Sequence, residues 1–90
     1  MKNLKEKSNK TLRTEQYKST FLKPTAFVAR SGKTVYISKE IHKKLSLLVF
    51  MLGGEELTLS DYMQNLLLRH LEDYKEEIKE IYNNNDKPIF

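Results

Sequence analysis

The pattern of hydrophobic and polar positions separates this chain of 90 residues into an irregular first part and a periodic second part. Residues 1 to about 24 are rich in Lys, Asn, Ser and Thr, and their few apolar residues hold no period of 2 or 3.6. Such a segment buries too little apolar surface to fold alone, and Pro24 excludes a helix running through it. The pattern therefore predicts a flexible arm over 1–32. A short apolar patch at 26–29 packs on the body or begins a local hairpin.

The segment 33–38, with the sequence KTVYIS, has the alternation that is typical of a β-strand. Four of its six residues are β-branched or aromatic, which favours extended backbone. Successive side chains of a strand point to opposite faces, so Val35 and Ile37 share one face and belong against a core. The opposite face carries Thr34, Tyr36 and Ser38.

Two helices follow the predicted strand. Ser38 can cap a helix over 39–52 whose apolar stripe is Ile41, Leu45, Leu48 and Leu52, and Gly53 and Gly54 end it. Thr58 and Asp61 have the spacing of a capping box, which places the start of a second helix at Leu59. Apolar residues recurring at three and four predict that this helix runs over 59–82, leaving 83–90 as a tail.

The ordered part, 33–82, is too small to stand alone as one strand and two helices. A lone strand leaves its backbone groups unpaired, and so short a chain buries little apolar surface. The sequence therefore predicts a mainly α fold with one β-strand, assembled as an intertwined homodimer through an intermolecular antiparallel two-stranded ribbon. A hairpin between 26–29 and 33–37 within one chain is the alternative. The predicted dimer core is Val35, Ile37, Ile41, Leu45, Leu48, Leu52, Tyr62, Met63, Leu66 and Leu67.

Charge is unevenly distributed along the chain. The 16 Lys and Arg residues against 12 Asp and Glu give a net charge of +4, but 1–33 carries +7 and 34–90 carries −3. A basic arm on a mildly acidic body favours an anionic partner, and nucleic acid is the first candidate, whereas a solvated tail is the simpler explanation.

Several classes of function lack the residues they need. The chain has no cysteine, and its two histidines, His42 and His70, have no metal-binding spacing, so we expect no metal, no cofactor and no enzymatic activity. The longest apolar stretch, 45–52, is far shorter than the roughly 20 residues of a membrane-spanning helix. We therefore expect a cytoplasmic protein that does not bind membranes.

The order of strand, short helix, glycine turn and capped longer helix resembles the ribbon-helix-helix superfamily of MetJ- and Arc-type repressors. The resemblance covers about 33–72, through the strand TVYIS, the junction ISKEI, the turn Gly53-Gly54 and the helix opening TLSDY. More narrowly, the run RSGKTVYISKEIHKKL, with SDY and RHLEDYKEEI downstream, looks like small ribbon-helix-helix proteins of Bacteroides-type conjugative transposons. The resemblance implies a bacterial DNA-binding factor with an accessory or regulatory role in conjugative transfer or mobilisation.

The same resemblance implies which residues contact DNA. In this superfamily the ribbon enters the major groove, which on this chain makes Thr34, Tyr36 and Ser38 the base-reading residues. The start of the second helix is implied as a phosphate site, and nearby cations would flank the groove. The predicted phosphate contacts are Arg30, Lys33, Lys39, Lys43, Lys44, Thr58 and Ser60.

Two other functions fit the same sequence. One is a helical dimerisation module that binds proteins and uses the basic arm as a tether. The other is an antitoxin of the ribbon-helix-helix type. The acidic end of the second helix, from Glu72 to Glu80, either docks a protein partner or holds the basic arm when DNA is absent.

Overall fold

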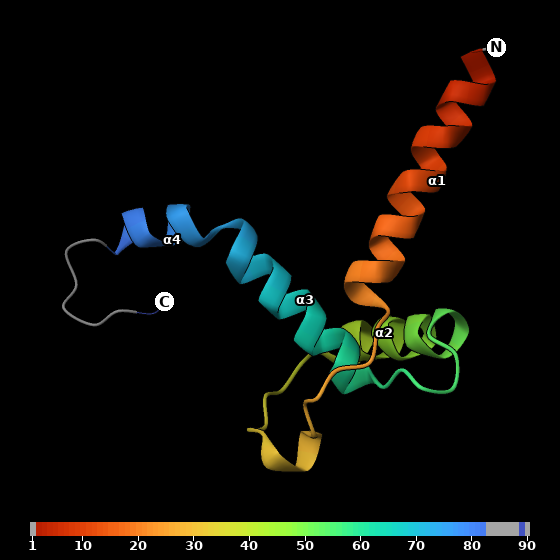
Figure 1. Ribbon diagram of the computed structural model, residues 1–90. Helices are drawn as coiled ribbons and strands as arrows, with labels where there is room; N and C mark the ends of the chain where they lie inside the picture. Colours follow the sequence, from red (N-terminus) through yellow and green to blue (C-terminus); the bar gives the residue numbers. More distant parts are fainter. Residues whose placement is uncertain (1, 83–88, 90) are drawn as a thin grey trace.

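The computed structural model describes residues 2–82 and 89, and within them the chain forms four α-helices (Figure 1). The helices are α1 (Lys2–Phe21), α2 (Lys39–Leu52), α3 (Leu59–Asp73) and α4 (Lys75–Ile81), and a short 3-10 turn, η1 (Ala29–Ser31), lies between α1 and α2. Residues 83–88 and 90 of the predicted tail lie outside the described residues. None of the four helices, as far as it is described, combines the length and apolar character needed to cross a bilayer.

The predicted strand is wrong, because the described residues contain no strand and 33–38 is coil. A strand requires a neighbour for its backbone groups, and within one chain the only nearby candidate was the patch at 26–29. That patch instead leads into η1, where the Ser31 amide donates to the Val28 carbonyl at 2.9 Å and the Gly32 amide to the Ala29 carbonyl at 3.0 Å. Over residues 2–82 the structure therefore has neither the ribbon of a ribbon-helix-helix fold nor the alternative hairpin.

A helix replaces most of the predicted flexible arm. Many residues of α1 are Lys, Glu, Gln, Leu or Arg, which are good helix formers even without an apolar period. The helix ends at Phe21, three residues before Pro24. Because its last turn packs on the body, α1 gains support that its sequence pattern does not reveal.

The helix α2 occupies the range 39–52 that the sequence predicts. The Ser38 hydroxyl accepts a hydrogen bond from the Ile41 amide at 3.2 Å and so caps the helix. The two glycines after α2 differ in role. Gly54 takes the left-handed conformation with φ 70°, whereas Gly53 remains helical and gives room to Leu57, whose atoms would lie 2.5 Å from an added Cβ.

The predicted capping box at the start of α3 is confirmed. The Thr58 hydroxyl accepts from the Asp61 amide at 3.0 Å, and the Asp61 carboxylate accepts from the Thr58 amide at 3.1 Å. The prediction of one helix over 59–82 is wrong, because Tyr74, with φ −114° and ψ 17°, separates α3 from α4. No glycine or proline lies near Tyr74, so the sequence has no breaker that would place this end.

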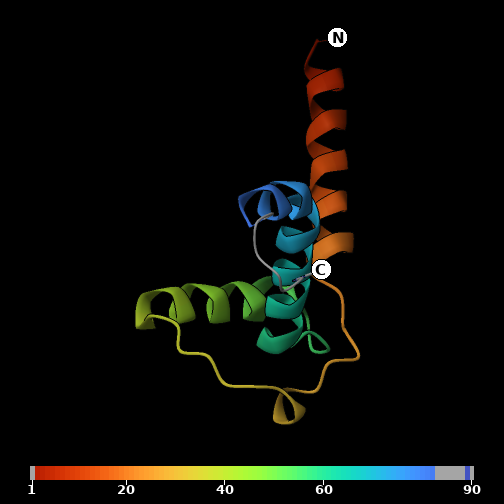
Figure 2. The same ribbon diagram turned by 90° about the vertical axis from the view of Figure 1, so that its left-hand side faces the viewer.

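The core lies where α1, α2 and α3 meet, and it is small. Val49, Leu57 and Tyr62 are its buried apolar residues, and the partly buried residues around them are Phe21, Leu22, Leu45, Leu48, Leu59 and Leu66. α1 rises from this junction at one side and α4 leads away at another (Figures 1 and 2). The radius of gyration is 16.8 Å, against about 12 Å for a compact chain of this length. The protein is therefore an open, branched assembly of helices.

Candidate nucleic-acid interface

The last turn of α1 is held on α3 by a buried polar contact. Asn65, which is 6% exposed, donates from its side-chain amide to the Phe21 carbonyl at 3.0 Å and to the Lys23 carbonyl at 2.9 Å. These carbonyls lie at the end of α1, where no further turn of helix can bond them. Asn65, which lies on α3, thus donates the hydrogen bonds that the carbonyls at the end of α1 would otherwise lack.

Asp61 provides the second part of this contact and is 5% exposed. One carboxylate oxygen accepts from the Thr25 amide at 3.1 Å and from the Thr25 hydroxyl at 2.8 Å, and the other accepts from the Thr58 amide. Burial by itself raises the pKa of Asp61, but the hydrogen bonds from Thr25 and Thr58 outweigh it and hold this pKa below its ordinary value. Asp61 is therefore a buried carboxylate that is stable in its charged form.

Two tyrosines complete the attachment of α1. The Tyr17 and Tyr62 hydroxyl oxygens lie 2.6 Å apart and share a hydrogen bond, and the Tyr17 ring lies 4.7 Å from that of Phe21. Burial, with the hydrogen bond to Tyr62, raises the pKa of Tyr17 to about 12. We call the set Tyr17, Thr25, Asp61, Tyr62 and Asn65 the α1 anchor.

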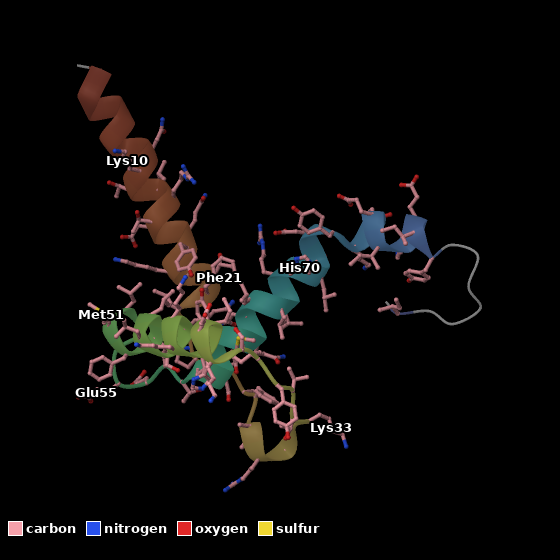
Figure 3. The ribbon with its side chains drawn as sticks, turned by 180° about the vertical axis from the view of Figure 1, so that it is seen from behind. Lys10, Phe21, Lys33, Met51, Glu55 and His70 are labelled. Carbon is pink, nitrogen blue, oxygen red and sulfur yellow. The ribbon has the colours of Figure 1, made fainter. Side chains whose placement is uncertain are left out.

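The rest of α1 projects away from the body. Every residue over 9–19 is exposed, although Tyr17, at 36%, is partly covered by its contact with Tyr62 (Figure 3). Lys10 and Arg13 lie on this projecting part, and neither has an acidic partner among the described residues. Lys18 forms an exposed ion pair with Glu15 at 3.7 Å. The chain thus presents most of its basic arm as a helix attached at its C-terminal end.

The predicted phosphate-contacting cations are exposed. Arg30 and Lys33 lie on the loop before α2, and none of the five cations has an acidic partner within the described part of the chain. Lys39, Lys43 and Lys44 occupy the first half of α2. We call Arg30, Lys33, Lys39, Lys43 and Lys44 the loop–α2 cations.

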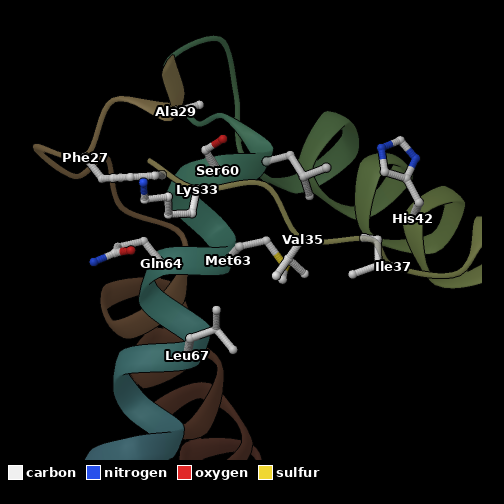
Figure 4. Close-up of a pocket in the computed structure, with 11 residues that line it drawn as sticks. Phe27, Ala29, Lys33, Val35, Ile37, His42, Ser60, Met63, Gln64 and Leu67 are labelled. Carbon is white, nitrogen blue, oxygen red and sulfur yellow. The ribbon is translucent and has the colours of Figure 1, made fainter. Parts of the chain in front are cut away.

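The hydroxyl-bearing residues that the sequence predicts as phosphate or base contacts differ in their surroundings. Thr58 is exposed but uses its hydroxyl in the capping box, whereas Ser60 is half-buried beside Lys33 (Figure 4). Ser38 is likewise a helix cap. Thr34 is exposed, and Tyr36 is 97% exposed, so its ring contacts little else.

An apolar groove of about 430 Å³ separates the loop before α2 from α3 (Figure 4). Phe27, Val35 and Ile37 line it from the loop, and Met63 and Leu67 line it from α3. Val35 is 77% exposed in spite of this position. The groove therefore leaves apolar surface uncovered in a single chain.

The predicted dimer-core residues divide into two groups. Tyr62 is buried, and Leu45, Leu48 and Leu66 pack against the core. Ile37 and Met63 are half-buried, whereas Val35, Ile41, Leu52 and Leu67 are exposed. The prediction omitted four residues that the structure buries, Val49, Leu57, Asp61 and Asn65. Asp61 carried a signal, its capping box, but nothing in the pattern marks Asn65 as buried.

Over its described residues, this is a small helical protein with a basic N-terminal helix that is clamped at its C-terminal end. Its sequence matches, over residues 1–85, the family described as "Protein of unknown function (DUF3408)". Because this match covers nearly the whole chain, the protein belongs to that family. No curated protein and no solved structure matches the chain.

Proposed function

We propose that this protein binds DNA through its exposed cations. The observation that carries the proposal is the exposure of Lys10, Arg13 and the loop–α2 cations without acidic partners among the described residues. Lysine and arginine in this state displace counterions from a nucleic-acid backbone and gain affinity from their release. The acidic residues are concentrated elsewhere, along the end of α3 and in α4.

The resemblance to proteins of conjugative transposons directs the proposal to a biological role. We place the protein among the accessory or regulatory factors of DNA transfer in bacteria, without a catalytic step of its own. α4, which carries Glu76, Glu77 and Glu80, is turned away from α1 (Figure 1) and remains a surface for a protein partner. The α1 anchor lies on the first half of α3, before this acidic stretch begins.

Salt dependence of binding tests the proposal. For the full chain on a mixed-sequence duplex, Lys43→Gln should reduce the slope of log K against log salt by about 0.9 for each DNA-contacting copy. Lys79→Gln removes one positive charge from the acidic α4 and should leave the slope unchanged. Fluorescence anisotropy over a salt series measures both slopes. Undetectable binding at low salt, or equal slopes for the two variants, would contradict the proposal.

We also propose that the active form is a homodimer, which is supported by the second half of α2. Here Leu47, Phe50 and Met51 are 55%, 81% and 68% exposed and share the face of α2 away from the core. Such an apolar patch on a small chain is typical of an interface. Together with the open groove beside α3, it gives a second copy apolar surface to cover.

Replacing Phe50 by glutamate should shift the protein toward the monomer, because a charge would be buried in the proposed interface. Leu12→Glu is the matched control, since Leu12 is 60% exposed on α1, outside this patch. Sedimentation equilibrium without DNA measures the dissociation constant of the dimer. We expect it to rise at least tenfold for Phe50→Glu and to stay unchanged for Leu12→Glu. A wild-type chain that is monomeric at micromolar concentration would refute the dimer.

A further inference from the structure

We propose that α1 is the element that reads DNA bases, with Asn9, Arg13 and Gln16 facing the base edges in the major groove. This inference rests on the proposed DNA binding and goes beyond it, because it assigns sequence recognition to one face of one helix. The helix is basic, with six Lys and Arg residues against two Glu.

The three side chains lie on one stripe of α1. With 3.6 residues per turn, positions 9, 13 and 16 fall within about 60° of one another around the helix. All three are exposed, and none has a hydrogen bond or ion pair with the side chains that the structure describes. The stripe is therefore available to an outside partner.

The chemistry of the stripe matches base recognition. Arginine bonds both acceptors of guanine in the major groove, and asparagine and glutamine each bond the donor and acceptor of adenine. The segment 33–38, in contrast, offers Thr, Tyr and Ser, which lack these paired groups. Within the chain, α1 thus has the side chains suited to distinguishing one base from another.

The shape and charge of α1 fit the same role. Its 20 residues form a rod about 30 Å long, and an α-helix is narrow enough for the major groove of B-DNA. Lys10 lies beside the stripe and can contact the phosphate backbone. Glu15 lies on another face and is paired with Lys18, so its charge is partly neutralised away from the stripe.

The α1 anchor fixes the C-terminal end of this helix on α3. Arg13 and Gln16 line one side of a groove of about 290 Å³ between α1 and α3, and Arg69 and Asp73 line the other. Arg69 is bonded to Asp73, with nitrogen and oxygen 3.0 Å apart. α1 is attached through its C-terminal end, and its earlier turns project from the body (Figure 1).

The experiment selects binding sites for the full chain from a duplex pool with a randomised centre and then measures variants on the selected duplex. Arg13→Ala should weaken specific binding between about 5-fold and 150-fold and relax the preference for guanine at one position. Arg13→Lys keeps the charge but loses the paired donors, so it should retain non-specific affinity and lose the same preference. Lys18→Ala, on the opposite face of α1, removes one charge and should keep the preference.

The outcomes separate this inference from the proposed function. Binding to duplex with no selected consensus, or a consensus that Arg13→Ala and Gln16→Ala leave unchanged, overturns base reading by α1 while DNA binding stands. A consensus that changes only in Tyr36→Ala assigns the reading to 33–38 and overturns the inference as well. Absence of duplex binding at low salt contradicts both base reading by α1 and the proposed DNA binding. Circular dichroism of Arg13→Ala, a substitution that favours helix, shows whether the fold is retained.

Discussion

Replacing Asp61 by alanine should lower the free energy of unfolding by about 3 kcal/mol. The substitution removes a buried carboxylate that accepts two hydrogen bonds from Thr25 and one from the Thr58 amide, and it breaks the capping box of α3. Urea unfolding followed by circular dichroism measures the change. Amide exchange should also accelerate at Leu22, whose N–H bonds Lys18 in the last turn of α1.

Asp73→Ala is the matched control for this prediction. Asp73 is an exposed aspartate on the same helix with an ion pair to Arg69, and its loss should cost about 0.5 kcal/mol or less. Equal destabilisation by the two substitutions would show that the α1 anchor does not hold the fold.

The stabilisation by Asp61 should also depend on pH. Because the folded protein lowers the pKa of this carboxyl, the contribution is fully present above the ordinary pKa of about 4 and is lost as the pH falls through the folded value. The difference in unfolding free energy between the wild type and Asp61→Ala should therefore shrink on acidification below about pH 4. A difference that stays constant to pH 2 would contradict the assigned cause.

Replacing Leu57 by alanine should destabilise the protein by about 3 kcal/mol. Leu57 is 6% exposed, lies against Gly53 and is one of three buried apolar residues in the described core. The truncation removes apolar contacts from this small core and leaves a cavity where the side chain lay.

Leu68→Ala makes the same chemical change at a residue of α3 that is 56% exposed. Its cost should stay within about 0.5 kcal/mol, because little apolar area returns to water. Thermal unfolding of the two variants side by side measures the contrast. Similar melting temperatures would mean that the loop before α3 does not contribute to the core.

The sequence predicted the features that depend on neighbouring residues. Ser38 and the pair Thr58 and Asp61 are helix caps that act over three residues, so their spacing was sufficient to place the starts of α2 and α3. The glycines after Leu52 marked the end of α2 for the same reason. Such signals need no knowledge of the rest of the fold.

The features that depend on distant contacts could not be predicted in this way. Alternation over 33–38 favours a strand, but a strand exists only with a paired neighbour, and the structure gives this segment none among the described residues. Over 9–21, α1 has no apolar period because it packs on the body near its end, through Phe21 and the partly covered Tyr17. Asn65 was hidden because its partners are backbone carbonyls 42 and 44 residues away.

The candidate nucleic-acid interface also contains residues that the sequence identified and residues that only the structure revealed. The sequence identified the loop–α2 cations from composition and position, and they are exposed in the structure. It did not identify the stripe of Asn9, Arg13 and Gln16, because such a stripe has meaning only once 2–21 is known to be a helix. Base contact by Thr34, Tyr36 and Ser38 stays a prediction.

The α1 anchor has a consequence for how relatives of this protein diverge. Asn65 bonds main-chain carbonyls, and Asp61 bonds the main-chain amide of residue 25 besides its hydroxyl, so much of the attachment does not depend on which side chains α1 carries. Residues along the projecting turns of α1 can therefore change while Asp61 and Asn65 on α3 keep their contacts. The α1 anchor therefore tolerates changes along the projecting turns of α1 without matching changes in α3.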